Sequence, residues 1–141
     1  MLEKEFEKLY YKFRSNYCKN LFRRANDGGE NLSATESYCV EVIFLLDRPS
    51  VHEFAGYVNI SLPNATYRIN NLIKKGFIRK VPSETDRREF KLEVTDKFLD
   101  SYGANATFNA HLMKKIKEKF SNEEVIELER MIKKIVEEIM Q

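Results

Sequence analysis

The stretch from Ser61 to Thr95 places the strongest constraint on how this chain can fold. Ser61 is a residue that caps helix N-termini, and Pro63 falls in the first turn, where a missing backbone N–H costs little. Apolar residues then recur at intervals of three and four up to Gly76, which predicts an amphipathic helix that ends at a glycine. These apolar positions are Leu62, Ala65, Ile69, Leu72 and Ile73. Two short apolar runs follow, joined by a charged segment, and they predict a β-hairpin.

Two further helices are predicted before this stretch. Ser33 and Glu36 form the pattern of a capping box, and the apolar residues after them predict a buried helix that ends before Pro49. Ser50 begins a shorter helix, with Val51, Phe54, Ala55, Tyr57 and Val58 expected to face inward. The order helix, helix, turn, helix, hairpin predicts a winged helix-turn-helix core over residues 33–95, in a chain that is mainly α.

The outward side of the predicted helix from Ser61 to Lys75 is polar and carries groups that hydrogen-bond base edges and phosphates. Arg87 and Arg88 lie in the segment that joins the strands, and arginines on such a projecting loop suit the minor groove of DNA. Asp86 is expected to hold one guanidinium through a bidentate pair. The predicted DNA contacts are Ser61, Pro63, Asn64, Thr66, Tyr67, Arg68, Asn71, Lys74, Arg87 and Arg88.

The distribution of charge supports this interpretation better than the net charge of +2 does. Between residues 61 and 91, eight Lys and Arg stand against three Asp and Glu, whereas residues 1–60 hold eight against nine and residues 92–141 eight against ten. Phosphate neutralisation requires such clustering, while an ordinary solvated surface mixes the two signs. The positive excess therefore coincides with the predicted helix and hairpin.

With Gly76, the run Asp86-Arg87-Arg88, Thr95 and Lys97, the chain resembles the wing signature of the MarR family of transcription regulators. Tyr67, Ser83-Glu84 and Phe98 depart from the family's usual residues. The resemblance implies that residues 61–75 are the recognition helix and that a wing arginine enters the minor groove. It also implies a homodimer held by the terminal helices and a small-molecule pocket beside the winged core.

Amphipathic helices are predicted at both ends of the chain, over residues 2–25, 96–119 and 121–140. A small winged core cannot cover all three, so we expect residues 1–32 and 96–141 of this single domain to form a dimerisation region around a two-fold axis. An intramolecular bundle is the alternative. The expected dimer contacts are Leu2, Phe6, Leu9, Phe13, Leu128, Ile132, Ile135 and Ile139.

The pocket implied by the resemblance has five aromatic candidates, which could equally be ordinary core residues. They are Tyr10, Phe13, Tyr17, Tyr38 and Phe44. None carries a charge, so the sequence does not identify an effector. Cys18 lies where peroxide-sensing members of the family keep a reactive thiol, but no flanking motif accompanies it.

No motif of an enzyme is present, and His52 and His111 are the only histidines. The spacing of Cys18 and Cys39 fits neither a zinc site nor a disulfide framework, so we expect no metal and no cofactor. No apolar run approaches the roughly 20 residues of a membrane span, and no secretory signal begins the chain, so a cytoplasmic location is expected.

Together these patterns predict a sequence-specific regulator that binds double-stranded DNA, as a homodimeric repressor on a palindromic operator, and that a small ligand releases. The alternative is a winged-helix module that binds an acidic protein partner through the same polar surface. Salt-dependent, sequence-dependent binding of a duplex distinguishes the two.

Overall fold

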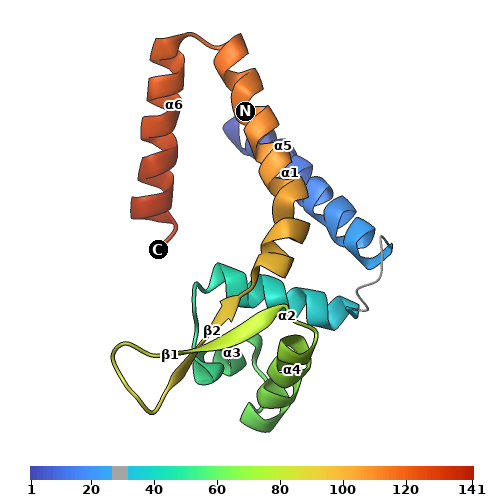
Figure 1. Ribbon diagram of the computed structural model, residues 1–141. Helices are drawn as coiled ribbons and strands as arrows, with labels where there is room; N and C mark the ends of the chain where they lie inside the picture. Colours follow the sequence, from blue (N-terminus) through green and yellow to red (C-terminus); the bar gives the residue numbers. More distant parts are fainter. Residues whose placement is uncertain (27–31) are drawn as a thin grey trace. The chain divides into compact units, whose positions relative to one another are not determined.

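The computed structural model describes residues 1–26 and 32–141, except for the side chains of residues 23–26 and 101–105. It divides into two compact units, Met1–Gly103 and Ala104–Gln141. Figure 1 shows the elements in order. They are α1 (Leu2–Asn26), α2 (Ala34–Leu45), α3 (Val51–Val58), α4 (Leu62–Lys74), β1 (Ile78–Pro82), β2 (Phe90–Val94), α5 (Asp96–Lys119), α6 (Asn122–Lys134) and η1 (Ile135–Ile139). The prediction of a mainly helical fold with one hairpin is confirmed.

Serine side chains begin four of the helices. Ser33, Ser50, Ser61 and Ser121 each accept a hydrogen bond from the backbone N–H three residues further on, which satisfies a donor that the helix itself leaves unpaired. In α2, α3 and α6 a glutamate three residues after the serine completes a capping box. The local sequence therefore determines where these helices begin.

In the helix-turn-helix, each of the two helices ends at a residue with left-handed backbone conformation. Asn59 caps the C-terminus of α3 with φ of +55°, a conformation that asparagine tolerates better than most residues. Gly76 follows the C-cap of α4 with φ of +82°, as the sequence predicted. The chain then turns directly into β1.

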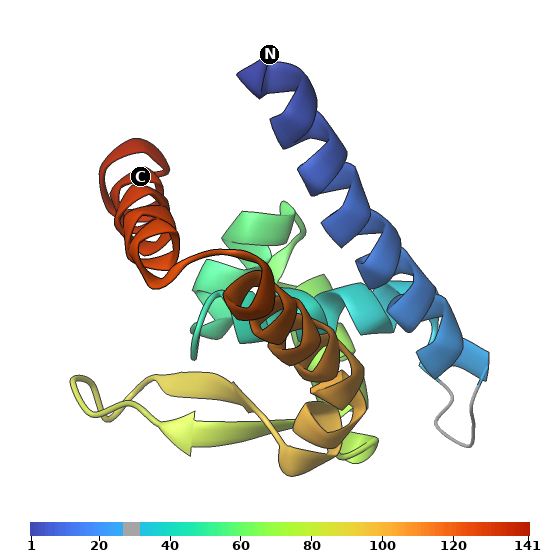
Figure 2. The same ribbon diagram turned by 90° about the horizontal axis from the view of Figure 1, so that it is seen from above.

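Strands β1 and β2 pair antiparallel, with Ile78 opposite Val94 at one end and Pro82 opposite Phe90 at the other. The hairpin extends beyond the helices of its unit and ends in a long loop (Figure 2). The segment before α3 adds an unpredicted edge contact, because Ser50 forms a β-bridge with Lys91. This contact ties the loop end of β2 to the start of the helix-turn-helix.

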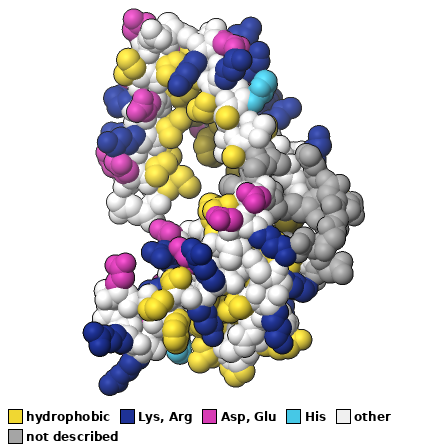
Figure 3. All heavy atoms as spheres, viewed as in Figure 1, with side chains coloured by type: hydrophobic (Ala, Val, Ile, Leu, Met, Phe, Trp, Pro, Cys, Tyr) yellow, Lys and Arg dark blue, Asp and Glu magenta, His cyan; other side chains and the backbone are white. Residues whose placement is uncertain are grey.

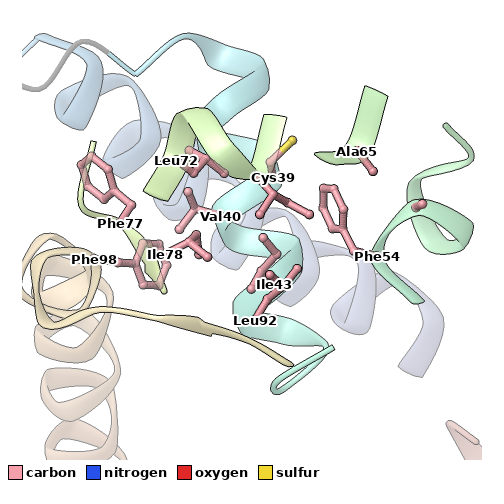
Figure 4. Packing of buried hydrophobic residues seen from close by; sticks show 12 residues of the cluster. Cys39, Val40, Ile43, Phe54, Ala65, Leu72, Phe77, Ile78, Leu92 and Phe98 are labelled. Atoms are coloured by element: carbon pink, nitrogen blue, oxygen red, sulfur yellow. The ribbon is translucent and has the colours of Figure 1, made fainter. Parts of the chain in front are cut away.

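The hydrophobic core lies where α2, α3, α4, the hairpin and the start of α5 meet (Figure 4). The buried apolar residues are Cys39, Val40, Ile43, Phe54, Ala55, Ala65, Ile69, Leu72, Phe77, Ile78, Leu92 and Phe98. Four residues that the sequence assigned to the core are instead exposed. They are Tyr38 at 54%, Leu45 at 70%, Tyr57 at 64% and Leu62 at 39%. Tyr57 projects to one side of the stripe formed by Phe54, Ala55 and Val58, and Leu62 belongs to the first turn of α4, ahead of the buried Ala65.

Most of α6 is solvent-exposed, and none of its residues is buried. The sequence predicted one continuous final helix, but the regular α-helix ends at Lys134 and a π-helical turn covers Ile135–Ile139. Among the described residues, no helix combines the length and the apolar character that crossing a membrane requires.

Candidate DNA-binding surface

The outward side of α4 forms one continuous polar face, which we call the recognition face. It consists of Pro63, Asn64, Tyr67, Asn70, Asn71 and Lys74. Tyr67 is 68% exposed, and Asn71 is half-buried. Thr66 and Arg68, the other predicted base contacts on α4, are half-buried and flank this face. The predicted face is therefore available to a partner, with Thr66 and Arg68 at its edges.

Arg68 does not extend freely into solvent. Its Nε donates a hydrogen bond to Oδ1 of Asn64, one turn earlier on α4, at 3.1 Å. This bond directs the guanidinium along the helix and uses one of the two acceptor positions of the Asn64 carbonyl oxygen.

Three contacts hold the C-terminal end of α4 in place. Nζ of Lys75 lies 3.0 Å from Oε1 of Glu36 on α2. Nζ of Lys97 donates to the carbonyl oxygen of Lys75 at 2.7 Å and lies over the Phe77 ring, 4.8 Å from its centroid. The hydroxyl of Thr95 donates to the carbonyl oxygen of Gly76. Glu36, Lys75, Thr95 and Lys97 are thus positioning residues for the recognition face.

Sequence reasoning did not assign these positioning roles. Thr95 and Lys97 were noted only as part of a family signature, and Glu36 only as half of a capping box. Their partners lie 19 to 39 residues away in the chain, so no local pattern identifies them.

The Glu36–Lys75 pair predicts a specific dependence of stability on pH. Burial raises the pKa of the Glu36 carboxyl, but hydrogen bonds from Lys75 and Ser33 outweigh this effect and leave the pKa below its ordinary value. A folded-state pKa below the unfolded value means that the stabilisation is complete above the unfolded pKa and is lost as the pH falls through the folded one. Glu36→Gln should therefore lower the free energy of unfolding by about 1 kcal/mol at neutral pH.

Urea denaturation of the wild type and of Glu36→Gln across pH 2.5 to 7 measures this effect. The difference between them should shrink below the ordinary pKa of 4.5. Glu84→Gln is the matched control, because Glu84 is exposed on the hairpin loop and has no ion pair within the described residues. An equal loss in both variants, or a difference unaffected by pH, contradicts the assignment.

The segment from Pro82 to Glu89, which we call the wing loop, is organised by Ser83 and Asp86. Ser83 is buried, and its Oγ accepts from the backbone N–H groups of Thr85 and Asp86. Oδ1 of Asp86 accepts from the backbone N–H of Arg88 at 2.9 Å. The expected bidentate pair between Asp86 and a guanidinium is wrong, because in this tight turn the nearby backbone donor engages the carboxylate.

Ion pairs divide the eight cations of residues 61–91 into two groups. Lys75, Arg79 and Lys91 are paired with Glu36, Glu93 and Glu53, respectively. A hydrogen bond from Arg79 lowers the pKa of the Glu93 carboxyl, and a hydrogen bond from Lys91 lowers the pKa of the Glu53 carboxyl. These three cations are already compensated.

The other five cations, Arg68, Lys74, Lys80, Arg87 and Arg88, have no carboxylate partner in the part of the chain that the structure describes. All of them except the half-buried Arg68 are exposed. In Figure 3, Lys and Arg side chains project from the end of the hairpin at lower left. The uncompensated positive charge therefore lies on α4 and on the hairpin.

The five candidate pocket residues do not share one environment. Tyr10 and Tyr38 are exposed, and Tyr10 lines an open depression along α1 with Phe6 and Tyr11. Phe44 packs against the core, with its ring centroid 5.5 Å from that of Phe98. Phe13 is exposed and Tyr17 is half-buried, both on α1. The alternative that these aromatic residues are ordinary core residues is thus confirmed for Phe44 and is wrong for Tyr38.

The remaining reactive side chains belong to elements other than α4. His52 and His111 are exposed, as is Cys18. Cys39 is a core residue, and burial raises the pKa of its thiol, which keeps it protonated and unreactive at neutral pH.

A short bracing helix, a turn, an exposed polar helix and a hairpin with an arginine-bearing loop define a winged helix-turn-helix protein. Residues 32–90 match the model of the MarR family, so this segment resembles the winged part of MarR-family proteins. No curated protein sequence matches the chain.

Several solved structures share this fold over nearly the whole chain. FabT from Streptococcus pneumoniae in complex with DNA is 22% identical, with 96% of this chain and 95% of that one covered and a TM-score of 0.58. The transcriptional regulator Tm0710 from Thermotoga maritima is 14% identical over 95% and 90%, with a TM-score of 0.62. A mutant MarR from Escherichia coli complexed with operator DNA is 16% identical over 95% and 92%, with a TM-score of 0.52. At these identities the likeness shows the fold.

Proposed function

We propose that this protein is a transcription regulator that binds double-stranded DNA as a homodimer and represses by occupying a palindromic operator. The observation that carries the proposal is a group of four exposed cations, Lys74, Lys80, Arg87 and Arg88, on α4 and the hairpin, which have no carboxylate partner among the described residues. Phosphate contacts supply most of the affinity in such complexes, while side chains in the major groove supply sequence preference. Two of the solved structures with this fold were determined with DNA, which supports the same function.

Exposed apolar side chains on the terminal helices support the dimer. Leu2, Phe6 and Leu9 on α1 are more than half exposed, and so is Val136 after α6. Apolar stripes of this length are normally covered in a soluble protein. In a two-fold dimer the two copies of α4 can lie about 34 Å apart, which is one turn of duplex DNA. That geometry requires a palindromic site.

The proposal does not include release by a small molecule. Of the candidate pocket residues, Tyr10 and Tyr38 lie on the protomer surface and Phe44 belongs to the core. The proposed role is that of a binding protein, and the chemistry of the recognition face is that of hydrogen bonding to bases and phosphates rather than of catalysis.

The dependence of DNA affinity on salt tests the proposal. On α4 and the hairpin, each protomer offers five cations that have no carboxylate partner within the described residues, namely Arg68, Lys74, Lys80, Arg87 and Arg88. At about −0.9 per neutralised phosphate, a dimer that uses all of them gives a slope of log K against log salt no steeper than about −9. Fluorescence anisotropy with a palindromic duplex, titrated from low to high salt, measures this slope.

Matched variants test whether these residues produce the salt dependence of DNA affinity. Lys80→Ala should reduce the slope by about two for the dimer, because one contact is lost from each protomer. Lys91→Ala should change it much less, because Glu53 already compensates Lys91 at 3.0 Å. Equal changes in both variants would show that the ion pairs do not decide which cations bind phosphate. Absence of binding to any duplex would leave the protein-interaction module as the function.

A further inference from the structure

Tyr67 occupies the centre of the recognition face. At about 100° per residue, its position lies opposite the buried side chains of Ala65, Ile69 and Leu72. One turn before it are Pro63 and Asn64, and one turn after it are Asn70 and Asn71. The most projecting part of α4 is thus an aromatic ring surrounded by amides and a proline.

The asparagine side chains next to Tyr67 are available for hydrogen bonding. Asn70 and Asn71 have no side-chain hydrogen bond within the described ranges. A carboxamide presents an acceptor and a donor side by side, which matches the N6 amino group and the N7 atom of adenine in the major groove. The Tyr67 ring and Pro63 offer apolar surfaces, which match the C5-methyl group of thymine.

The cations of α4 are poorly placed to contact guanine. A specific guanine contact directs a guanidinium or ammonium group at O6 and N7. Arg68, the single arginine of α4, lies at the edge of the recognition face, about 100° around the helix from Tyr67, and the bond from its Nε to Asn64 directs the guanidinium along the helix. Lys74 is the last residue of α4, three residues beyond Asn71, and is the furthest of this set from the N-terminal part with which recognition helices contact bases.

We propose that Tyr67, Asn70 and Asn71 are the specificity-determining residues of α4 and that they select A·T base pairs in the major groove at the centre of each half-site. This inference rests on the proposed function and states what the recognition face selects.

Selection of bound duplexes from a random pool, followed by base substitution, tests the inference. Selected half-sites should carry A·T pairs at their centres. Replacing one such pair by G·C should weaken binding about 5- to 150-fold, the usual range for one specific contact. Replacing it by inosine·C should weaken binding equally, because inosine has the major-groove edge of guanine and, like adenine, no amino group in the minor groove.

The inosine duplex distinguishes base selection by α4 in the major groove from base selection by the hairpin in the minor groove. If arginines of the wing loop select A·T pairs through the minor groove, inosine·C will bind as well as A·T, and the inference is overturned. Enrichment of G·C pairs at the half-site centres also overturns it, while the proposed function stands. A pool with no enrichment at all overturns both.

Two pairs of variants assign the preference to individual side chains. Tyr67→Phe should keep the preference for thymine over uracil, which lacks the methyl group, and Tyr67→Ala should lose it. The double variant Asn70→Ala, Asn71→Ala should reduce the preference for A·T over G·C at least fivefold. Lys80→Ala is the control, and it should weaken all duplexes by the same factor. A preference unchanged in all the α4 variants refutes the assignment.

Discussion

Replacing Arg87 and Arg88 together with alanine is expected to weaken duplex binding more than any other change on this surface. Each contact is worth about 1 to 3 kcal/mol, and a dimer presents the pair twice. Neither side chain has a carboxylate partner in the described structure, so their full charge is available to DNA. The dissociation constant from fluorescence anisotropy, at one fixed salt concentration, measures the loss.

Arg79→Ala is the control for this double variant. Arg79 also lies on the hairpin, but its Nε is 2.6 Å from Oε2 of Glu93, which in turn pairs with Arg48. Its removal should therefore change the dissociation constant only slightly. An unchanged affinity in the Arg87→Ala, Arg88→Ala protein would refute the role of the wing loop. A loss as large in Arg79→Ala would show that the whole hairpin, rather than its tip, binds DNA.

Ile132→Asp is expected to dissociate the proposed dimer. Ile132 is 49% exposed in the protomer and lies on the apolar stripe of α6 with Val125 and Leu128. Burial of an isoleucine contributes about 1.5 to 3 kcal/mol, and a two-fold interface loses two of them and gains two unpaired carboxylates. The dissociation constant of the dimer should rise by a factor of at least about 100. Sedimentation velocity measures this change, and DNA affinity should fall with it.

Ile126→Asp provides the matched control for the dimer experiment. Ile126 is 66% exposed and lies on the opposite side of α6, at a helical angle away from the apolar stripe. The Ile126→Asp substitution should leave the dimer intact. Circular dichroism should give the same helix content for both variants, since neither residue is buried. A wild-type protein that is monomeric at micromolar concentration, or two variants that dissociate equally, would contradict the predicted interface.

The candidate site could be predicted in part because its polar face is a local pattern. Spacing along α4 separates the buried Ala65, Ile69 and Leu72 from the exposed Asn64 and Tyr67 without any knowledge of the partner elements. Which cations are compensated could not be predicted, because Glu36 and Glu53 precede their partners by 39 and 38 residues. The same limit applies to Tyr38 and Tyr57, whose exposure depends on which elements cover them.

The sequence alone determined where α2, α3 and α4 begin and where α4 ends, because serine caps, Gly76 and the apolar spacing act within one or two turns. Only the tertiary structure decided how α4 is held and which charges remain free. Those features depend on contacts between distant segments, such as Lys75 with Glu36 and Lys97 with the end of α4. Such contacts exist only once the core has packed, so no local pattern in the chain encodes them.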